Sequence, residues 1–529
     1  MLLKNNCIYY SLAGADTLST LRIVSDGGKN EEFSGDEALF ALKKLLDIDE
    51  KIYVFDAKEL YKYLLIHNFA FSPAQKLLFL DLQTGAFLSE PKIKKELLEF
   101  IAKGDVVSAA KLLEFTLPET VKKAWLEVES PLTYILAQME LNGVYLDTQK
   151  LEKVQDELSD SIAITTRSIH EKLGSAININ STQQLGAALV AKGYALAKKG
   201  KSGSISTDRD SLEKLRLGDE TGLIEAILLY RTVAKLQSGF IMPLLNQMDM
   251  FSSRIHTTYN QVQASTGRLS SQNPNLQNIP VKDAHFGSKI RSCIIAEEGN
   301  MLVGADYSQI ELRFLAHFTG EPVLVDAFAS QQDIHARTAA EIFDIPVEKI
   351  TSAERRIGKT LNFALLYQQS VFGTAKQLGV DGATAKGYVQ RYFERFPGVK
   401  PFIMQVLAEA KECGYTETYL GRRVYYPELA SKFHGLRAAA ERAAFNSVLQ
   451  GSNADLIKMA MLQLDTAMTH ESIPYRLILQ VHDELVMEVH KKYSEQAAKI
   501  LKESMELDQP LKVPVLVEVG IGKNWAEIK

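Results

Sequence analysis

The feature that most restricts how this chain can fold is an acidic site inside each of two apolar runs that lie far apart in the sequence. Residues 477–489, LILQVHDELVMEV, read as a β-strand, yet His482, Asp483 and Glu484 interrupt the run where burial should be deepest. Asp306 interrupts the apolar run MLVGADYSQIELR in the same way. Buried carboxylates destabilise a fold unless they are paired or bind a cation. An isolated acid is usually a turn or cap residue, so only a fold that brings Asp306 and Asp483 together would make a site.

If the two aspartates meet, a hard divalent cation suits them. Mg²⁺ prefers oxygen ligands and commonly takes one or two carboxylates together with substrate phosphates. Two such ions about 4 Å apart can hold the attacking and leaving oxygens of a phosphoryl transfer. The acids therefore point toward phosphoryl-transfer chemistry with two Mg²⁺ ions, and Mn²⁺ is the alternative metal.

Length and composition limit the classes of protein to consider. At 529 residues the chain exceeds what one hydrophobic core usually serves, so we expect several domains. It is 46% hydrophobic and 24% charged, which argues against disorder, and its net charge of −5 neither favours nor excludes a nucleic-acid partner. The scattered cysteines predict neither a disulfide framework nor a zinc site. The absence of a signal-peptide core or a long apolar run predicts no membrane contact and an intracellular location, and leaves an organellar one open.

The chain divides into regions of different character. Residues 1–120 alternate short strand-like and helical runs, which predicts a small α/β domain. Residues 121–245 are mostly helical, with a helix C-cap signal at Asn142–Gly143. The basic segment AKKGKSGSISTDRD at 197–210 is either a solvated loop or a contact to a phosphate backbone. Residues 255–529 carry the unusual features.

One of these features is the segment ERRIGKTLNFALLYQQS at residues 354–370. Arg355, Lys359, Phe363 and Tyr367 recur every four residues, which places them along one stripe of a helix. Ion pairs could explain the cations, and core packing could explain the rings. The order fits a nucleotide better, with the cations on the triphosphate, Phe363 at the sugar and Tyr367 at the base.

Several motifs resemble those of one known family. DYSQIELR (306–313), RRIGKTLNFALLY (355–367) and QVHDE (480–484) resemble the polymerase motifs of family A DNA polymerases, the bacterial DNA polymerase I family. TGRLSSQNPNLQNIP (266–280) and ERAAFNSVLQGSNADLIK (441–458) are similar to its primer- and template-contacting segments. The resemblance implies template-directed addition of dNTPs to a primer 3′-hydroxyl, with primer-template DNA and dNTPs as partners. It also implies a monomer that works in replication or repair, in the cytoplasm or nucleoid if the source is bacterial.

The resemblance also implies a fold. An α/β, 3′–5′ exonuclease-like domain at residues 1–120 would precede a right-hand polymerase domain at 121–529. That domain would combine an α+β palm with an antiparallel sheet, helical fingers and a helical thumb. The expected bounds are about 125–250 for the thumb, 251–320 and 415–529 for the palm, and 321–414 for the fingers.

The same motifs imply a role for each active-site residue. Asp306 and Asp483 would bind the metal ions, with the backbone carbonyl of Tyr307 as a further ligand, and Glu484 would assist without being indispensable. Lys359 would bind the triphosphate and protonate the leaving pyrophosphate. The implied nucleotide-binding residues are Gln309, Glu311, His335, Arg355, Lys359, Phe363 and Tyr367.

For two of these residues a plainer interpretation stays open. Glu311 matches the position that excludes a ribose 2′-hydroxyl, but it could be a surface charge on a helix. His335 matches a position near the triphosphate, but it could be a structural histidine.

The implied DNA contacts come from separate segments. Arg268 and His482 would lie near the primer terminus. Arg442, Asn446 and Gln450 recur every four residues, so a second helix would lay a polar stripe along the template or minor groove. Minor-groove acceptors are nearly alike in all correct base pairs, so such contacts can test pair geometry without reading sequence.

The chain departs from the family pattern at two places beside the nucleotide stripe. Gln368 and Ala364 stand where the family usually has glycine. Glycine would permit a bend or a close approach at the end of the helix. We therefore hypothesise that Gln368 changes the mismatch profile of the enzyme.

The N-terminal region departs further, because the acids of a 3′–5′ exonuclease are missing. Asp16 is followed by Thr17 and Leu18 instead of an Asp-x-Glu pair, and Leu60 stands where an acid is expected. This chemistry needs several metal-binding carboxylates. We predict a folded domain without proofreading activity, and the family's 5′-nuclease domain is also missing from the sequence.

Two other functions remain to be weighed. A non-catalytic nucleic-acid-binding protein would not need Asp306, Asp483, Arg355 and Lys359 together. A polymerase that uses RNA as template or product is the other alternative. Glu311 favours deoxynucleotides as precursors, while the choice of template stays open.

Overall fold

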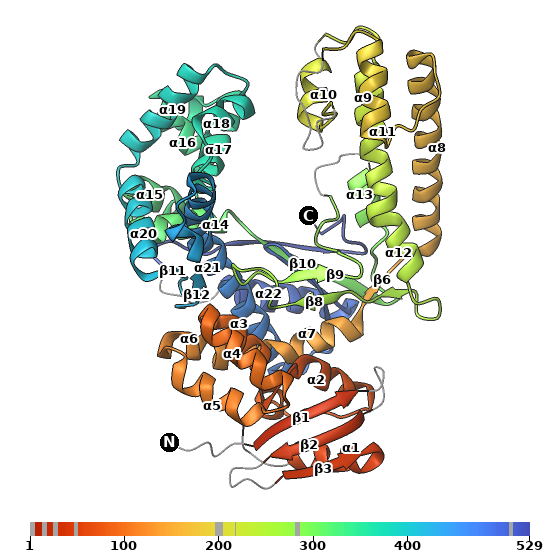
Figure 1. Ribbon diagram of the computed structural model, residues 1–529, viewed down its shortest axis with the longest axis vertical. Helices are drawn as coiled ribbons and strands as arrows, with labels where there is room; N and C mark the ends of the chain where they lie inside the picture. The colour runs from red at the N-terminus through yellow and green to blue at the C-terminus, as the bar shows by residue number, and fades with distance from the viewer. Residues whose placement is uncertain are drawn as a thin grey trace.

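Apolar strands build one sheet at the N-terminus and another at the centre of the molecule, and helices rise from the central sheet as two arms (Figure 1). The computed structural model describes residues 6–12, 18–24, 30–46, 51–195, 205–216, 218–280, 286–506 and 511–528. Most of the basic segment 197–210, together with Asp16 and Thr17, lies outside these residues. Among the described helices, none is long and apolar enough to cross a membrane.

The N-terminal sheet has the strand order β3-β2-β1-β4-β5. β2 pairs antiparallel with β1 and β3, whereas β4 pairs parallel with β1 and β5. Neighbouring residues of β1 enter different cores, since Ile8 packs with α1 and α2 and Cys7 packs with α4 and α5. Helices therefore cover both faces, as parallel strands require. The elements are β1 Asn6–Leu12, β2 Leu18–Val24, β3 Asn30–Ser34, α1 Gly35–Leu46, β4 Ile52–Val54, α2 Ala57–Ile66, β5 Phe79–Asp81, α3 Leu82–Leu88, α4 Pro91–Ala102, α5 Val106–Thr116 and α6 Glu119–Ala124.

The central sheet is antiparallel throughout, with the strand order β13-β14-β10-β15. α7 packs against β13, α22 packs against β10 and β15, and the long helix α21 runs beside them. As the C-cap signal predicts, α7 ends at Asn142, where Gly143 takes a φ of 59°. The elements are α7 Ser130–Asn142, β10 Asn300–Tyr307, α21 His434–His470, β13 Tyr475–Val481, β14 Glu484–His490, α22 Ser494–Glu506 and β15 Val517–Gly522.

Two helical arms stand on opposite sides of this sheet, and the N-terminal domain lies beneath it (Figure 1). One arm contains α8 Thr148–Leu173, α9 Thr182–Ala191, α10 Arg209–Arg216, α11 Leu223–Leu236 and α12 Met242–Gln247. The other contains α14 Ile310–Thr319, α15 Pro322–Ala329, α16 Ile334–Phe343, α17 Ser352–Leu366, α18 Val371–Leu378, α19 Gly382–Arg395 and α20 Val399–Cys413. Other short strands and one short α-helix are β6 Val144–Tyr145, β7 Arg254–Ile255, β8 Thr258–Asn260, β9 Ser270–Gln272, α13 Phe286–Arg291, β11 Tyr415–Glu417 and β12 Arg423–Tyr425.

The run 477–489 is a hairpin and not the single strand that its apolar pattern suggested. β13 ends at Val481 and β14 begins at Glu484, and these two residues pair across the ladder. His482 and Asp483 form the turn between them, with His482 at a φ of 55°. A two-residue hairpin turn needs a left-handed residue of this kind, because its twist then matches that of the strands. Asp483 therefore lies at the tip of a hairpin and not in the buried middle of a strand.

The C-terminal segment lies across the central sheet in space left by two glycines. Gly304 of β10 and Gly520 of β15 are paired in the ladder, and a side chain at either would collide with Ile528. The Trp525 amide donates to the carbonyl oxygen of Ile294 (2.9 Å). These contacts bring Trp525, fully buried, beneath β14.

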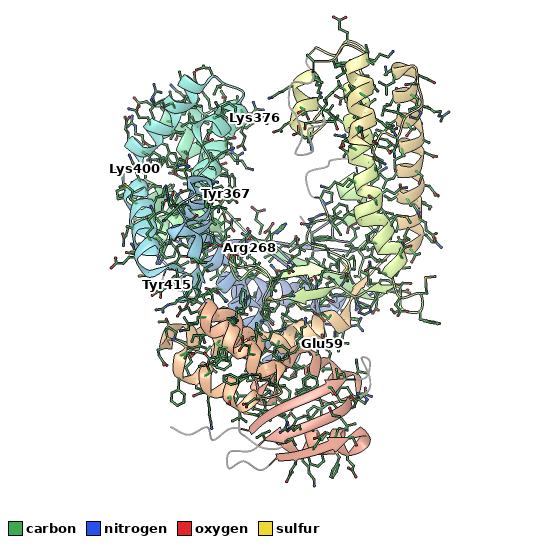
Figure 2. The ribbon with its side chains drawn as sticks, in the orientation of Figure 1. Glu59, Arg268, Tyr367, Lys376, Lys400 and Tyr415 are labelled. Carbon is green, nitrogen blue, oxygen red and sulfur yellow. The ribbon has the colours of Figure 1, made fainter. Side chains whose placement is uncertain are left out.

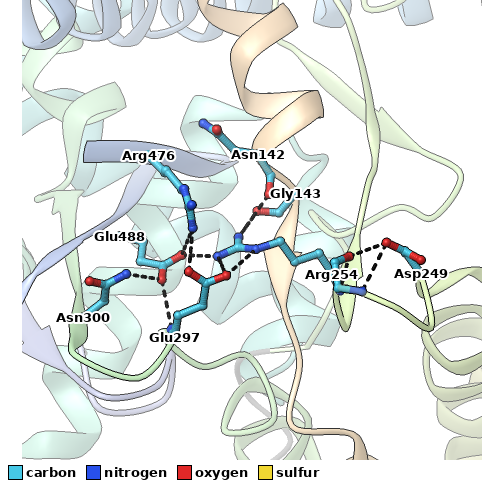
Figure 3. A network of polar contacts seen from close by, with 9 residues as sticks. Asn142, Gly143, Asp249, Arg254, Glu297, Asn300, Arg476 and Glu488 are labelled. Atoms are coloured by element: carbon cyan, nitrogen blue, oxygen red, sulfur yellow. Dashed lines mark hydrogen bonds and ion pairs between the residues drawn. The ribbon is translucent and has the colours of Figure 1, made fainter. Parts of the chain in front are cut away.

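A polar network ties β14 to the end of α7 (Figure 3). The Arg254 guanidinium donates to the carbonyl oxygens of Asn142 (3.0 Å) and Gly143 (3.1 Å). The same group contacts Glu488 of β14 (2.7 Å) and Glu297 (2.9 Å). Glu488 is only 2% exposed, and its charge is fully matched by this network.

A buried cluster of charges joins the segment before α7 to α21. Lys458 and Arg422 both contact Glu129, the former at 2.6 Å, and Arg422 also contacts Asp455 at 2.7 Å. Burial alone would raise the pKa of Glu129, but the two cations lower it to about 2. The cluster contains equal numbers of opposite charges, which is the condition for burying ions at low cost.

Candidate active site

The two acidic sites and the cationic helix stripe meet on one open cavity of about 1360 Å³, between the central sheet and the arm that holds α14–α17. β10 and the β13–β14 turn bring the aspartates, and α16 and α17 bring the cations and rings. Figure 2 shows Tyr367 and Arg268 where this arm meets the sheet. The lining residues are Arg268, Asp306, Tyr307, Gln309, Ile310, Glu311, Leu312, His335, Arg355, Lys359, Phe363, Leu366, Tyr367, His482 and Asp483.

Backbone and side-chain bonds hold the two aspartates on the same wall. The Tyr307 amide, next to Asp306, donates to the carbonyl oxygen of Asp483 (3.1 Å). Asn453 Nδ2 donates to Asp483 Oδ1 (2.6 Å) from α21. Asn453 was not among the predicted site residues, although it lies three residues after Gln450 and so continues the polar stripe of that helix.

The donor set of the cavity suits a cation that shares its coordination with a substrate. Within the described residues, no group of three or more His, Cys, Asp or Glu side chains could hold a metal ion. Asp306 and Asp483 both line the cavity, and Mg²⁺ commonly takes one or two carboxylates together with substrate phosphates. These residues therefore fit an ion that arrives with a nucleotide.

Glu484, which we expected to assist the aspartates, does not line the cavity. It pairs with Asp306 in the β10–β14 register, but its side chain is only 2% exposed. Its Oε1 accepts a hydrogen bond from Trp525 Nε1 (3.0 Å), and its Oε2 lies 3.8 Å from Arg291 Nη1. Residues outside every motif therefore hold the Glu484 carboxylate in the core beside Asp306, and its assisting role stays a prediction.

Glu311 lies on the cavity wall and is not a surface charge. It is 9% exposed, and Arg268 Nη2 contacts its Oε1 at 2.7 Å. Tyr367 also hydrogen-bonds to its side chain. Burial raises the pKa of Glu311, Arg268 opposes this shift, and Asp483 adds to it. Glu311, Tyr367 at the end of the helix stripe and Arg268, the predicted primer contact, thus form one linked group.

The capping residues at the start of α17 position the stripe of cations and rings on this helix. Thr351 and Glu354 form a capping box there, so the register of the helix is set one turn before Arg355. Arg355 contacts Asp333 at the start of α16 (2.6 Å), whereas Lys359 has no ion pair among the described residues. α17 ends at Leu366, so Tyr367 is its C-cap, and the Phe363 and Tyr367 rings stack with centroids 6.2 Å apart.

His335 is both buried and on the cavity. It is 3% exposed, and its Nδ1 lies 3.1 Å from Asn362 Nδ2. Burial, with help from Lys359 and Arg355, lowers its pKa to about 4, so the ring is neutral near pH 7. α16 and α17 approach closely here, because a side chain at Gly358 would collide with the His335 carbonyl oxygen.

The three residues of α21 that are predicted to contact DNA lie outside the main cavity. Arg442, Asn446 and Gln450 lie on this helix, but none of them lines the cavity that holds the aspartates. Arg442 lines a neighbouring cavity of about 1000 Å³, whose wall Tyr367 shares. The other residues of that wall are Gln368, Gln369, Ser370 and Gln377.

An antiparallel sheet with two aspartates at one end, faced by a helix of cations and rings, defines a polymerase-type architecture. Residues 148–527 match the sequence model of DNA polymerase family A, and the chain belongs to that family. The family predicted from the motifs is thus confirmed.

Curated proteins with similar sequences support the assignment to this family. The chain is 42% identical over 402 residues to DNA polymerase I of Pseudomonas aeruginosa, covering 76% of this chain and 44% of that protein. It is 43% identical over 409 residues to the thermostable DNA polymerase I of Thermus aquaticus, covering 77% of this chain and 49% of the relative. The chain therefore spans about half the length of the curated relatives it matches.

A solved structure shares the fold over nearly the whole chain. It is the POL domain of Pol1 from M. smegmatis in complex with a DNA primer-template and dNTP. The TM-score is 0.90 with 31% sequence identity, over 99% of this chain and 96% of the other. The predicted polymerase fold is confirmed by this likeness.

Proposed function

We propose that the chain is a template-directed DNA polymerase that adds dNTPs to a primer 3′-hydroxyl and releases pyrophosphate. One observation carries the proposal: Asp306 and Asp483 lie on the same cavity as Arg355 and Lys359. Acids that suit a metal ion and cations that suit a triphosphate therefore face one space. The M. smegmatis neighbour is bound to primer-template DNA and dNTP, the partners that we propose for this chain.

The residues at the reacting end would position the phosphates. Asp306, Asp483 and the Tyr307 carbonyl would hold two Mg²⁺ or Mn²⁺ ions, which supply charge stabilisation to the attacking and leaving oxygens when bound. Arg355 and Lys359 would hold the triphosphate. Lys359 would also give a proton to the departing pyrophosphate, as a general acid.

The residues at the sugar and base end would select the nucleotide. Phe363 would pack on the sugar and Tyr367 would border the base. Glu311, buried in the wall, would fill the space of a ribose 2′-hydroxyl. Gln309 would line the nucleotide site, and the neutral His335 would offer an N–H to a phosphate oxygen.

The DNA would be held by residues on either side of this cavity. Arg268 and His482 line the cavity and would contact the primer end. Arg442, Asn446 and Gln450 would follow the template or the minor groove along α21. Because Arg268 is bonded to Glu311 here, DNA binding would require Arg268 to exchange this partner for the duplex.

The domains would follow the right-hand plan. We assign residues 125–250 to the thumb, 251–320 and 415–529 to the palm, and 321–414 to the fingers. Residues 1–120 would be an exonuclease-like domain without proofreading activity. The enzyme would act as a monomer inside the cell, in the cytoplasm or nucleoid of a bacterium.

Primer extension tests this proposal. Wild type, Asp483→Ala and Glu518→Gln would be compared with dNTPs or rNTPs on DNA and RNA templates. Glu518 pairs with Asp306 across the β10–β15 ladder but is exposed and does not line the cavity, so it is the matched control. We expect extension with dNTPs by wild type and Glu518→Gln, none by Asp483→Ala, and none after chelation of the metal.

The opposite results would identify a different function. Absence of extension by folded wild-type protein would support a binding protein, and preferred use of rNTPs would reject the role of Glu311. A mismatched 3′ end incubated without dNTPs tests proofreading, since we expect no shortening of the primer.

A further inference from the structure

Arg291 is a buried arginine beside Glu484, the residue that follows Asp483. It is 4% exposed, and its guanidinium lies 3.8 Å from the centre of the Trp525 ring. Among the described residues, its Nε and Nη1 have no hydrogen-bond partner. A buried cation with unmatched donors destabilises a fold, so its position calls for an explanation beyond packing.

The neighbours of Arg291 are the acids next to the cavity. Its Nη1 lies 3.8 Å from Glu484 Oε2, and both Glu484 and Asp306 act on its charge. The Trp525 indole holds the other oxygen of Glu484 at 3.0 Å. Arg291 and Trp525 thus face a carboxylate that is next to Asp306 in the ladder but outside the cavity.

A second buried pair on the same strand shows what a purely structural contact looks like. Glu488 of β14 is also 2% exposed, but Arg254 contacts it at 2.7 Å and Asn300 bonds to it at 2.8 Å (Figure 3). Arg291, the last residue of α13, is farther from Glu484 and keeps unused donors, and Glu484 begins β14 next to the turn that reaches the cavity. The two pairs therefore differ in how completely their polar atoms are hydrogen-bonded and in their position relative to the cavity.

We infer that Arg291 is a positioning residue that, with the Trp525 indole, keeps the Glu484 carboxylate out of the cavity and offsets its charge, so that a metal ion meets two carboxylates there and not three. The inference rests on the proposed metal site at Asp306 and Asp483. A weakly held metal leaves with the product, whereas a third carboxylate would add charge and ligand oxygens and so retain it.

Direct binding of Mn²⁺, measured by electron paramagnetic resonance on the protein with primer-template DNA and no dNTP, tests this role. We expect Arg291→Met to bind Mn²⁺ more tightly, by about 10-fold, because a cation close to the site is lost. Arg291→Lys, which keeps the charge, should bind nearly as wild type does. Trp525→Phe keeps an aromatic ring but removes the indole N–H, and should tighten Mn²⁺ binding by a few-fold.

The double variant Arg291→Met/Glu484→Gln separates this role from a general effect on stability. It removes one charge of each sign, so Mn²⁺ affinity should return to the wild-type value. Arg254→Met is the matched control, since it breaks the other buried pair on β14 and should leave Mn²⁺ affinity unchanged. Thermal unfolding measured by circular dichroism identifies variants that fail to fold; if Arg291→Met is among them, the Mn²⁺ affinity of Trp525→Phe decides the question.

Two results would overturn the inference. One is wild-type Mn²⁺ affinity in Trp525→Phe and, where it folds, in Arg291→Met; the other is tighter binding that persists in the double variant. Asp306→Asn separates this failure from failure of the metal site itself. If Asp306→Asn weakens Mn²⁺ binding while the Arg291 and Trp525 variants do not change it, only the role of Arg291 is rejected.

Discussion

The N-terminal domain and the central sheet both place aspartates where strands end, but the partners of these acids differ. Asp81 ends β5, is 1% exposed, and accepts hydrogen bonds from the amides of Ala57 (2.5 Å) and Thr84 (2.7 Å). It is therefore the N-cap of α3, and it also accepts from the first amide of α2, whose own N-cap is Asp56. Asp306 and Asp483 instead line an open cavity.

The difference shows that an acid at a strand end is a site only when its oxygens face a space that a ligand can enter. Ligands of parallel α/β sheets usually bind at the carboxyl ends of strands, where Asp56 and Asp81 lie. Burial, followed by the nearby Asp56, raises the pKa of Asp81 to about 7. Two backbone amides nonetheless occupy both of its oxygens, which supports our proposal that the domain does not proofread.

The largest expected effect is on catalysis at the cavity acids. Asp306→Asn should lower the rate of primer extension by at least about 100-fold, because a charge that holds the metal ions is lost. Asp56→Asn, at a strand end of the other region, should leave the rate unchanged. Single-turnover extension measures both, and similar losses in the two variants would abolish the contrast between the regions.

For stability, we expect the larger effect from an acid of the N-terminal domain. Asp81→Ala should lower the free energy of unfolding by about 1–3 kcal/mol, because two buried amides lose their acceptor. Urea unfolding followed by circular dichroism measures this change, and extension per folded molecule should stay at the wild-type level. A loss of extension without a loss of stability would show that Asp81 has a functional role.

The pH dependence of folding stability tests whether His335, at the cavity, is held neutral. The pKa of His335 is about 4 in the folded protein against about 6.5 when unfolded, so only the unfolded chain takes up the proton between these values. The stability that depends on neutral His335 is present above pH 6.5 and is lost as the pH falls toward 4. Between pH 7 and pH 5, wild type should lose about 1–2 kcal/mol more than His335→Gln does. Equal losses in urea titrations would show that His335 is not held neutral by its surroundings.

The smallest expected effect concerns the backbone at the end of α17. Gln368 has a φ of 47°, a conformation that costs a residue with a side chain about 1 kcal/mol. Gln368→Gly should gain about that much stability and also change the ratio of mismatched to correct insertion, since Gln368 lines the cavity next to Tyr367. Ser472→Gly, at a φ of 54° in an exposed turn, is the control that should gain stability alone. An unaltered mismatch ratio in Gln368→Gly would remove the hypothesis about fidelity.

Local spacing predicted much of the site. Arg355, Lys359 and Phe363 share one helix face because four residues make slightly more than one turn, and all three line the cavity. Spacing was less informative at the hairpin, since the turn at His482 and Asp483 interrupts the alternation of a strand without changing its composition. A pattern of apolar residues does not reveal where the chain reverses.

The sequence by itself determined the polymerase family, the helix stripe and the two acids that line one cavity. Only the tertiary structure decided which acids are available to a ligand, because that depends on partners from distant segments. Trp525 and Arg291 hold Glu484 in the core, and backbone amides occupy Asp81. A carboxylate has the same appearance in a sequence whether protein partners enclose it or it lines a cavity, and only the packing of remote segments distinguishes the two.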